Sequence, residues 1–196
     1  MAHPVGKQSS DRWRASVKSC KVCGKEFEQF KTTQRVCSPV CALDDAKSRI
    51  AKKKAAETRQ MRKDFNASDR SYQLKKAQES FNGYIRERDK GMGCISCGTT
   101  DESLRYDAGH YRTTGAHPEL RFAEDNCHRQ CHYNCNINRS GNITDYRIGL
   151  VRRIGSERVE WLERDHPAKK YTLDEIIEIK LKYRKKLKEL KLAREL

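Results

Sequence analysis

Residues 94–136 of the 196-residue chain decide the fold and read CISCGTTDESLRYDAGHYRTTGAHPELRFAEDNCHRQCHYNCN. The stretch opens with two cysteines that have two residues between them, and it closes with two that have three residues between them. Two such pairs can supply the four thiolates of one tetrahedral zinc ion. We therefore predict a structural zinc site formed by Cys94, Cys97, Cys131 and Cys135.

The wide spacing of the second pair leaves its ligand set open. Cys127, His128 and His132 all lie within a few residues of Cys131 and could replace a cysteine at the metal. Cys127 is most simply interpreted as a spare buried thiol. We keep the four cysteines as the prediction and these three residues as competitors.

A second group of four cysteines precedes this stretch, and its two pairs have the same internal spacing as the pairs described above. The group consists of Cys20, Cys23, Cys37 and Cys41. In a reducing compartment, closely paired cysteines are more often metal ligands than disulfides. We predict another structural zinc ion here, which is the first of the two zinc sites in chain order. Unligated thiols, or thiol redox chemistry at the two Cys-x-x-Cys motifs, are the alternatives.

The composition indicates a basic protein with a small apolar core. Hydrophobic residues make up 36% of the chain and charged residues 35%, and the net charge is +15. The small apolar fraction predicts metal sites and long polar helices, while the charge favours a polyanion such as nucleic acid. We see no run of roughly 20 apolar residues that could span a membrane and no apolar signal segment. We therefore expect a cytosolic protein without a membrane partner.

The positive charge is concentrated in the flanks of the chain. No lysine occurs between residues 91 and 168. We expect the flanks to contact the phosphates of a nucleic acid, although solvated helix faces would have the same composition. The residues expected at the nucleic acid are Arg112, Arg129, Arg139, Lys52, Lys53, Lys54, Lys185 and Lys186.

The patterns predict an α+β, mostly helical chain in five parts. These are a disordered basic tail (1–19), a four-cysteine zinc module (20–42), a basic helix or linker (43–70), a core with the second zinc site (71–143) and a helical region (144–196).

Several elements can be predicted within these parts. Short strands are expected at 104–106 and 120–122, and helices are expected to begin at Ser71, Thr144, Ser156 and a capping box over 172–175. The last helix has an apolar stripe from Ile176 to Leu190. Such a stripe packs on the core or forms a coiled coil with a second copy.

Four polar residues near the second zinc site could act on a phosphodiester. Hydrolysis needs an activated water and a metal ion that stabilises the developing charge. A histidine suits the first task near neutral pH, and His110 stands at the end of a predicted strand. Oxygen ligands suit magnesium, and Asp107 and Asn136 are nearby residues that carry them, while Asn126 follows the second predicted strand.

At these residues the chain resembles the HNH, or His-Me finger, nucleases, whose zinc-containing members have a ββα-metal motif in a treble-clef arrangement. The resemblance implies that His110 is the general base, that Asn126 orients it and that Asn136 binds a catalytic Mg²⁺ or Mn²⁺ ion. Asp107 and His128 are further candidate ligands of that ion. The position of Asn136 directly after the last cysteine is similar to the arrangement in phage recombination endonuclease VII.

Longer stretches resemble the NinG (Rap) proteins of lambdoid phages. They are 81–89, 94–98, 107–114, 120–122 and 140–142. The resemblance implies a magnesium-dependent endonuclease that cuts Holliday junctions and D-loops during phage homologous recombination. It also implies the cytoplasm of the bacterial host, with phage or host recombination proteins as partners.

Cutting two strands of branched DNA favours a homodimer. We hypothesise an interface on the stripe 176–190 or on the helix over 71–89. The alternative function is that of a non-catalytic zinc-containing nucleic-acid-binding protein.

Overall fold

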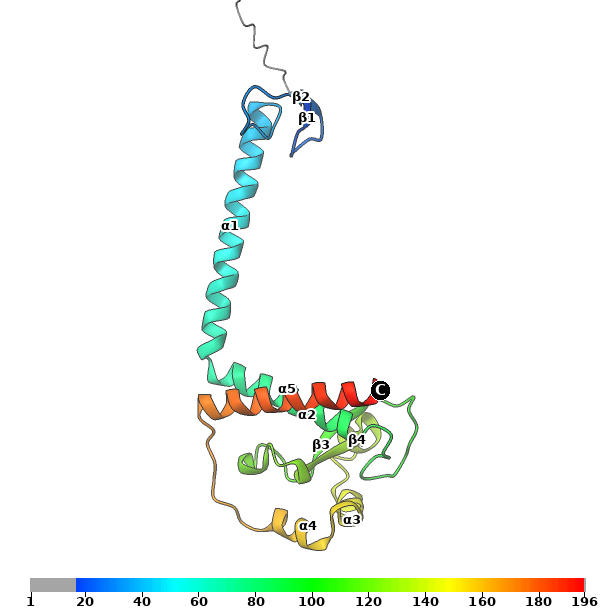
Figure 1. The fold of residues 1–196 in the computed structure, drawn as a ribbon. Coiled ribbons are helices and arrows are strands. Elements are labelled where there is room, and N and C mark those ends of the chain that lie inside the picture. Colours follow the sequence, from blue (N-terminus) through cyan, green and yellow to red (C-terminus); the bar gives the residue numbers. More distant parts are fainter. Residues whose placement is uncertain (1–16, 196) are drawn as a thin grey trace, which may run out of the picture. The chain divides into compact units, whose positions relative to one another are not determined.

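The computed structural model describes residues 17–195 and divides into two compact units, with the boundary between Lys63 and Asp64 (Figure 1). The predicted tail over 1–19 lies outside the described residues apart from 17–19, which form a strand. No described helix is long and apolar enough to cross a membrane. The helices and strands are β1 (Val17–Ser19), β2 (Glu26–Glu28), α1 (Pro39–Ser68), α2 (Arg70–Arg88), β3 (Tyr106–His110), β4 (Cys127–Cys131), α3 (Ile143–Ile154), α4 (Ser156–Glu163) and α5 (Leu173–Glu195). These helices and strands confirm the predicted α+β, mostly helical fold class.

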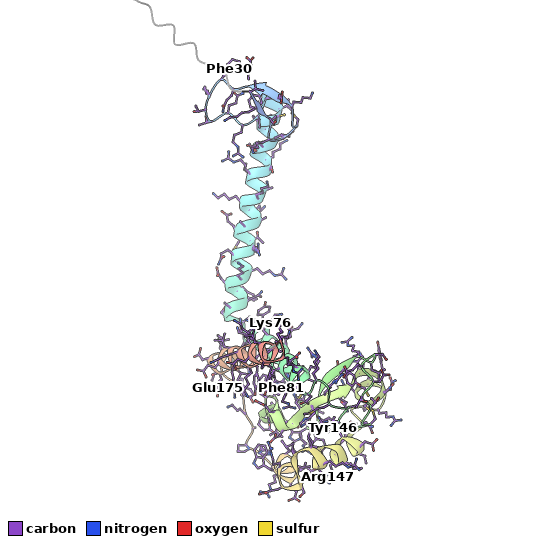
Figure 2. All side chains as sticks on the ribbon, turned by 45° about the vertical axis from the view of Figure 1, so that its right-hand side comes forward. Phe30, Lys76, Phe81, Tyr146, Arg147 and Glu175 are labelled. Carbon is purple, nitrogen blue, oxygen red and sulfur yellow. The ribbon has the colours of Figure 1, made fainter. Side chains whose placement is uncertain are left out.

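The first unit consists of a small hairpin and most of α1. Strands β1 and β2 are antiparallel, with Lys18 opposite Phe27. Within α1, Cys41 is the buried residue, and the other side chains project outward along the helix (Figure 2). Of the two alternatives predicted for 43–70, a basic helix or a linker, the structure shows an exposed helix as far as Ser68.

In the second unit, α2 and α5 pack along each other and form the first part of the core. Phe81 of α2 lies edge-on to Tyr183 of α5, with ring centroids 4.8 Å apart. The residues of the α5 stripe that pack here are Ile176, Ile179, Tyr183, Leu187 and Leu190. Core packing of the stripe is thus confirmed. Neither this stripe nor the apolar face of α2 is left as a free surface for a second copy.

The ends of the helices follow local capping chemistry. At α5 the predicted capping box is present: the Thr172 amide donates to Glu175 Oε2 at 2.8 Å, and the Glu175 amide donates to Thr172 Oγ1 at 3.2 Å. Helix α2 is capped by Asp69, which accepts from the Tyr72 amide, so the expected cap at Ser71 is wrong by two positions. Gly155 ends α3 at a φ of +86°, a conformation that favours glycine.

A second antiparallel hairpin, β3 with β4, forms the centre of this unit. Asp107 is opposite Gln130, and His110 is opposite Cys127. The prediction of a strand at 120–122 is wrong, because Leu120 ends the short 3-10 helix Pro118–Leu120 and Phe122 lies in the turn after it, and both are buried. Asn126 consequently precedes the second strand instead of following it.

Helices α3 and α4 cover the hairpin with a separate apolar cluster. Tyr146 of α3 is fully buried, and its hydroxyl donates to the Gly109 carbonyl of β3 at 2.8 Å. Gly149 brings α3 against the chain beside Cys94, since a Cβ there would lie 1.8 Å from the Ile95 carbonyl oxygen. Close helix packing therefore fixes α3 to both the hairpin and the cysteine turn.

Candidate functional site

The cysteines of the second predicted zinc site lie in one cluster. The Sγ atoms of Cys94, Cys97, Cys131 and Cys135 all lie within 4.8 Å of one another. Sγ of Cys131 is 3.6 Å from that of Cys94 and 3.7 Å from that of Cys97. Four thiolates around zinc at about 2.3 Å would be about 3.8 Å apart, whereas a disulfide would join two sulfurs at about 2.0 Å. The four cysteines could hold a structural zinc ion.

The three competitor ligands lie outside this cluster. The fully buried Cys127 has its Sγ 3.6 Å from His110 Nδ1. The side chains of His128 and His132 contact Asp89 and Asp107 respectively. The fold therefore brings the four predicted cysteines together and places the three competitors elsewhere.

The cysteines of the first unit form a matching cluster, with all four Sγ atoms within 4.8 Å. Hydrogen bonding from the Cys23 amide is the main reason that the pKa of Cys20 is lowered to about 6. The pKa of Cys37 is raised to about 12, chiefly by its hydrogen bond to Cys23. One thiolate is thus stabilised while a neighbour keeps its proton. A divalent cation would let all four ionise, as a zinc site requires.

The extra residue between Cys131 and Cys135 is accommodated by a π-helical turn over His132–Ile137. The amide of Asn138 donates to the Tyr133 carbonyl, five residues back, at 2.9 Å. A π turn takes one residue more than an α turn. The wide cysteine pair therefore still converges on one cluster, and Asn136 is presented directly after it.

This turn brings Asn136 to Asp107 of β3, the two residues expected to share a catalytic metal ion. Asn136 Nδ2 donates to Asp107 Oδ2 at 2.8 Å, and His132 Nδ1 donates to the same oxygen at 2.5 Å. Burial by itself would raise the pKa of Asp107, but the hydrogen bonds from His132 and Asn136 outweigh it and lower the pKa. The carboxylate is therefore ionised near neutral pH, and its oxygen chemistry suits a hard divalent cation.

The part played by His132 in this group was not predicted from the sequence, which suggested it only as a zinc competitor. It directly follows Cys131, and its amide donates to the Arg105 carbonyl at 2.9 Å. That backbone bond extends the pairing of β3 and β4 by one step and sets the imidazole beside Asp107. The sequence signal that could have identified this role is the position of His132 directly after the cysteine that ends β4.

His110 lies at the end of β3, as predicted, but it contacts other partners. Its Nε2 lies 3.0 Å from the Arg121 carbonyl, and its ring centroid lies 5.9 Å from that of Phe81. Burial lowers the pKa of His110 to about 4, so the ring is neutral near pH 7. Side chains alternate between the two faces of a strand. His110 and Asp107, three positions apart, accordingly leave β3 on opposite faces.

Asn126 fixes the chain that follows His110. The Asn126 side chain is fully buried. It accepts from the Arg112 amide at 2.7 Å and donates to the Arg112 carbonyl at 2.9 Å and to the Leu120 carbonyl at 3.1 Å. One side chain therefore joins the segment after His110 to the turn before β4. This arrangement suits the orienting role expected of Asn126.

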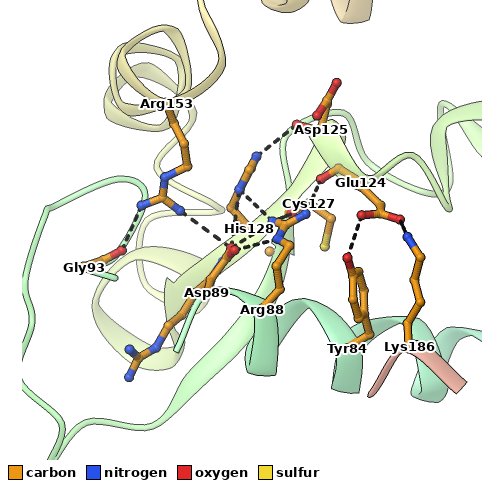
Figure 3. A network of polar contacts seen from close by, with 12 residues as sticks. Tyr84, Arg88, Asp89, Gly93, Glu124, Asp125, Cys127, His128, Arg153 and Lys186 are labelled. Atoms are coloured by element: carbon orange, nitrogen blue, oxygen red, sulfur yellow. Dashed lines mark hydrogen bonds and ion pairs between the residues drawn. The ribbon is translucent and has the colours of Figure 1, made fainter. Parts of the chain in front are cut away.

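His128 belongs to a buried ionic network and not to the Asp107 group (Figure 3). Arg88 Nη2 lies 2.9 Å from His128 Nδ1, and His128 Nε2 lies 3.2 Å from the Asp125 carbonyl. Asp89, which is 2% exposed, pairs with Arg88 at 2.6 Å and with Arg153 at 3.6 Å. Since protein groups occupy both ring nitrogens, the expected metal role of His128 has no support here.

The residues expected at nucleic acid fall into two groups. Arg129 is 5% exposed, forms two hydrogen bonds with Glu102 and stacks on Tyr106, so it is a structural residue. Lys186 pairs with Glu124 at 2.6 Å, and Arg112 is partly buried. Exposed side chains belong to Lys52, Lys53, Lys54, Arg139 and Lys185.

Comparison with known proteins gives a consistent result. The family model described as "Bacteriophage Lambda NinG protein" matches residues 14–194. The chain is 42% identical to protein ninG of Escherichia phage lambda over 189 residues, which cover 88% of this chain and 91% of that protein. It is 41% identical to protein ninG of Escherichia phage 933W, with 90% and 95% covered, and 40% identical to that of Salmonella phage P22, with 92% and 97% covered. No solved structure matches the chain.

Proposed function

Since the chain belongs to the bacteriophage lambda NinG protein family, we propose that it is a metal-dependent endonuclease that cuts branched DNA, such as Holliday junctions and D-loops, in phage recombination. The observation that supports this most is the contact of Asn136 with Asp107, beside a cysteine cluster that could hold zinc. It is compatible with the hairpin, metal ligand and zinc site that the resemblance to the HNH, or His-Me finger, nucleases implies. The host cytoplasm is the proposed location.

The reaction would divide among few residues. Mg²⁺ held by Asp107 and Asn136 would stabilise the charge that develops on the phosphate and the leaving oxygen. His132 holds the Asp107 carboxylate through Nδ1. The resemblance makes His110 the proton acceptor. Its Nδ1 lies 3.6 Å from the buried Cys127 Sγ and its Nε2 lies 3.0 Å from the Arg121 carbonyl, so the ring would have to turn away from them to reach the attacking water. Asn126 holds the segment after His110 in place.

The test is cleavage of a labelled four-way junction and of a matched linear duplex, with magnesium or EDTA. Magnesium-dependent cutting of the junction is expected, with a loss of about 100-fold or more in Asn136→Ala and in His110→Ala. Asn134→Ala, an exposed asparagine on the same turn, is the matched control and should cut normally. Junction binding and zinc content should be unchanged in all three variants.

A second function is favoured by the surroundings of His110. Both of its ring nitrogens face protein atoms, and its pKa is low for a base that works near pH 7. A non-catalytic zinc protein that binds branched DNA would have such a histidine. Salt-sensitive binding of both DNAs without cutting, under any divalent metal, would establish this alternative and refute the nuclease.

The role of His132 can be separated from that of His110. If His132 only positions Asp107, His132→Ala should raise the magnesium concentration needed for half-maximal cutting and leave the rate at saturating magnesium little changed. A rate that saturating magnesium does not restore would make His132 the proton acceptor in place of His110.

A further inference from the structure

Helix α1 exposes a line of large apolar side chains that the proposed nuclease does not use. Leu43, Ile50 and Met61 are 64%, 69% and 66% exposed, and Val40 is 68% exposed. Helices in proteins gain most of their stability from packing an apolar face against other parts of the protein. Among the described residues of its own unit, this helix of 30 residues, in which Cys41 is the buried residue, has no such partner.

The apolar residues belong to a longer line with alternating steps of three and four. The positions are 40, 43, 47, 50, 54, 57 and 61, occupied by Val, Leu, Lys, Ile, Lys, Glu and Met. This spacing is the seam of a two-stranded coiled coil, in which the two helices meet along one line. The seam of α1 contains three charged residues, so the direction of a partner helix decides which charges face each other.

A second copy of the same helix complements this seam when it runs antiparallel. Parallel pairing in register would set Lys47, Lys54 and Glu57 each against its own like charge. Antiparallel pairing sets Lys47 opposite Glu57 of the second copy, Leu43 opposite Met61 and Ile50 opposite Lys54. Lysine can keep its charge in water while its stem covers apolar surface. By symmetry each of these pairs forms twice.

The opposite side of α1 is basic and would stay free in such a dimer. Arg49, Lys52, Arg59 and Lys63 follow one another at steps of three, seven and four, and all are exposed. Half a helical turn separates this line from the seam. Glu57, the sixth of the seven seam positions, would be repelled by an anionic lipid surface, and this favours a protein partner.

We propose that residues 40–61 of α1 form the homodimer interface, as an antiparallel two-stranded coiled coil in which Lys47 pairs with Glu57 of the second copy. The interface goes beyond the nuclease proposal and does not depend on it. It also replaces the two surfaces on α2 and α5 that the sequence suggested, both of which pack inside the chain.

The test is the mass of the zinc-loaded full chain in solution without DNA, measured by sedimentation equilibrium. The wild type should have about twice its 22.8 kDa. Lys47→Glu and Glu57→Lys should each raise the dissociation constant of the dimer about tenfold or more, because each places like charges together. The double variant should restore dimerisation, and mixing the two single variants should give a heterodimer.

Lys52→Glu, on the basic side, is the matched control with the same change of charge as Lys47→Glu, and it should remain dimeric. A monomeric wild type at micromolar concentration would overturn the proposal, including one that instead binds anionic vesicles. So would a dimer that neither single variant weakens, since another surface would then form it. Nuclease activity is not measured, so a failure here leaves the nuclease proposal standing.

Discussion

Single residues in this protein acquire their properties from neighbours far away in sequence. Asp107 is ionised beside His132 and Asn136, 25 and 29 positions later, while His110, three positions away, is held neutral by burial. The sequence predicted that Asp107 and Asn136 would meet, because a zinc-held turn after a hairpin brings them together. It did not predict the opposite faces, because the strand was expected at 104–106 and therefore did not contain both residues.

The depressed pKa of His110 makes stability depend on pH. The unfolded chain takes up this proton near pH 6.5, and the folded chain takes it up only near pH 4. The free energy of unfolding should therefore fall as the pH drops from about 6.5 towards 4, by about 2 kcal/mol from this group. Urea denaturation at pH 7 and pH 5 with excess zinc measures it. His110→Gln should have a shallower dependence, and equal slopes would contradict the assignment.

Asp89 is the centre of the buried ionic network. Burial would raise the pKa of its carboxyl, but hydrogen bonds from His128 and Arg88 outweigh burial and hold the pKa well below its usual range. Asp89→Asn would leave Arg88 and Arg153 without their shared counter-charge. We expect a loss of about 3 to 5 kcal/mol in urea denaturation. The exposed Asp101→Asn should leave stability almost unchanged, and similar losses for both variants would refute this account.

At the level of elements, some local signals were predicted correctly, whereas the cap at Ser71 and strand β4 were not. The capping box at Thr172 and the breaker Gly155 are read from a few adjacent residues, and both occur as expected. Strand β4 reads Cys-His-Arg-Gln-Cys, without the β-branched or aromatic residues that favour strands. All five residues are nevertheless buried. Pairing with β3 and the cysteine cluster hold this segment extended, and no local pattern could show that.

The approach of α3 to the cysteine turn depends on Gly149. Gly149→Ala would place a Cβ 1.8 Å from the Ile95 carbonyl oxygen, which is backbone and cannot move aside alone. The helix would have to shift, at a cost of about 3 kcal/mol or more. Thermal or urea unfolding would measure this loss. Gly115→Ala, which meets nothing within 4 Å, is the control, and an equally stable Gly149→Ala would show that α3 is not packed this closely.

For the whole molecule, the division into two units places one cysteine cluster in each. The sequence indicated both clusters, because each cluster consists of two pairs of cysteines that are close in sequence. It could not show where one unit ends, since α1 continues through the boundary as an unbroken helix.

Zinc should accordingly be bound and lost in two independent steps. The purified chain should contain two zinc ions, and Cys37→Ser should contain one while keeping the unfolding transition of the second unit. Cys131→Ser should lose the other ion and that transition, because binding free energy at a structural zinc site is folding free energy. Metal analysis with calorimetry checks both variants. Loss of both ions in Cys37→Ser would show that the clusters are coupled.

The π turn over His132–Ile137 has a consequence for how such chains can change length. It absorbs one residue between two fixed points, Cys131 at the end of β4 and the Cys135–Asn136 pair. Deleting Tyr133 or Asn134, both exposed, would convert it to an ordinary α turn with the same end points. We therefore expect the loss of one residue at this spot to have little effect on the cysteine cluster. In a lineage of related genes, a length difference here would say little about whether the function has diverged.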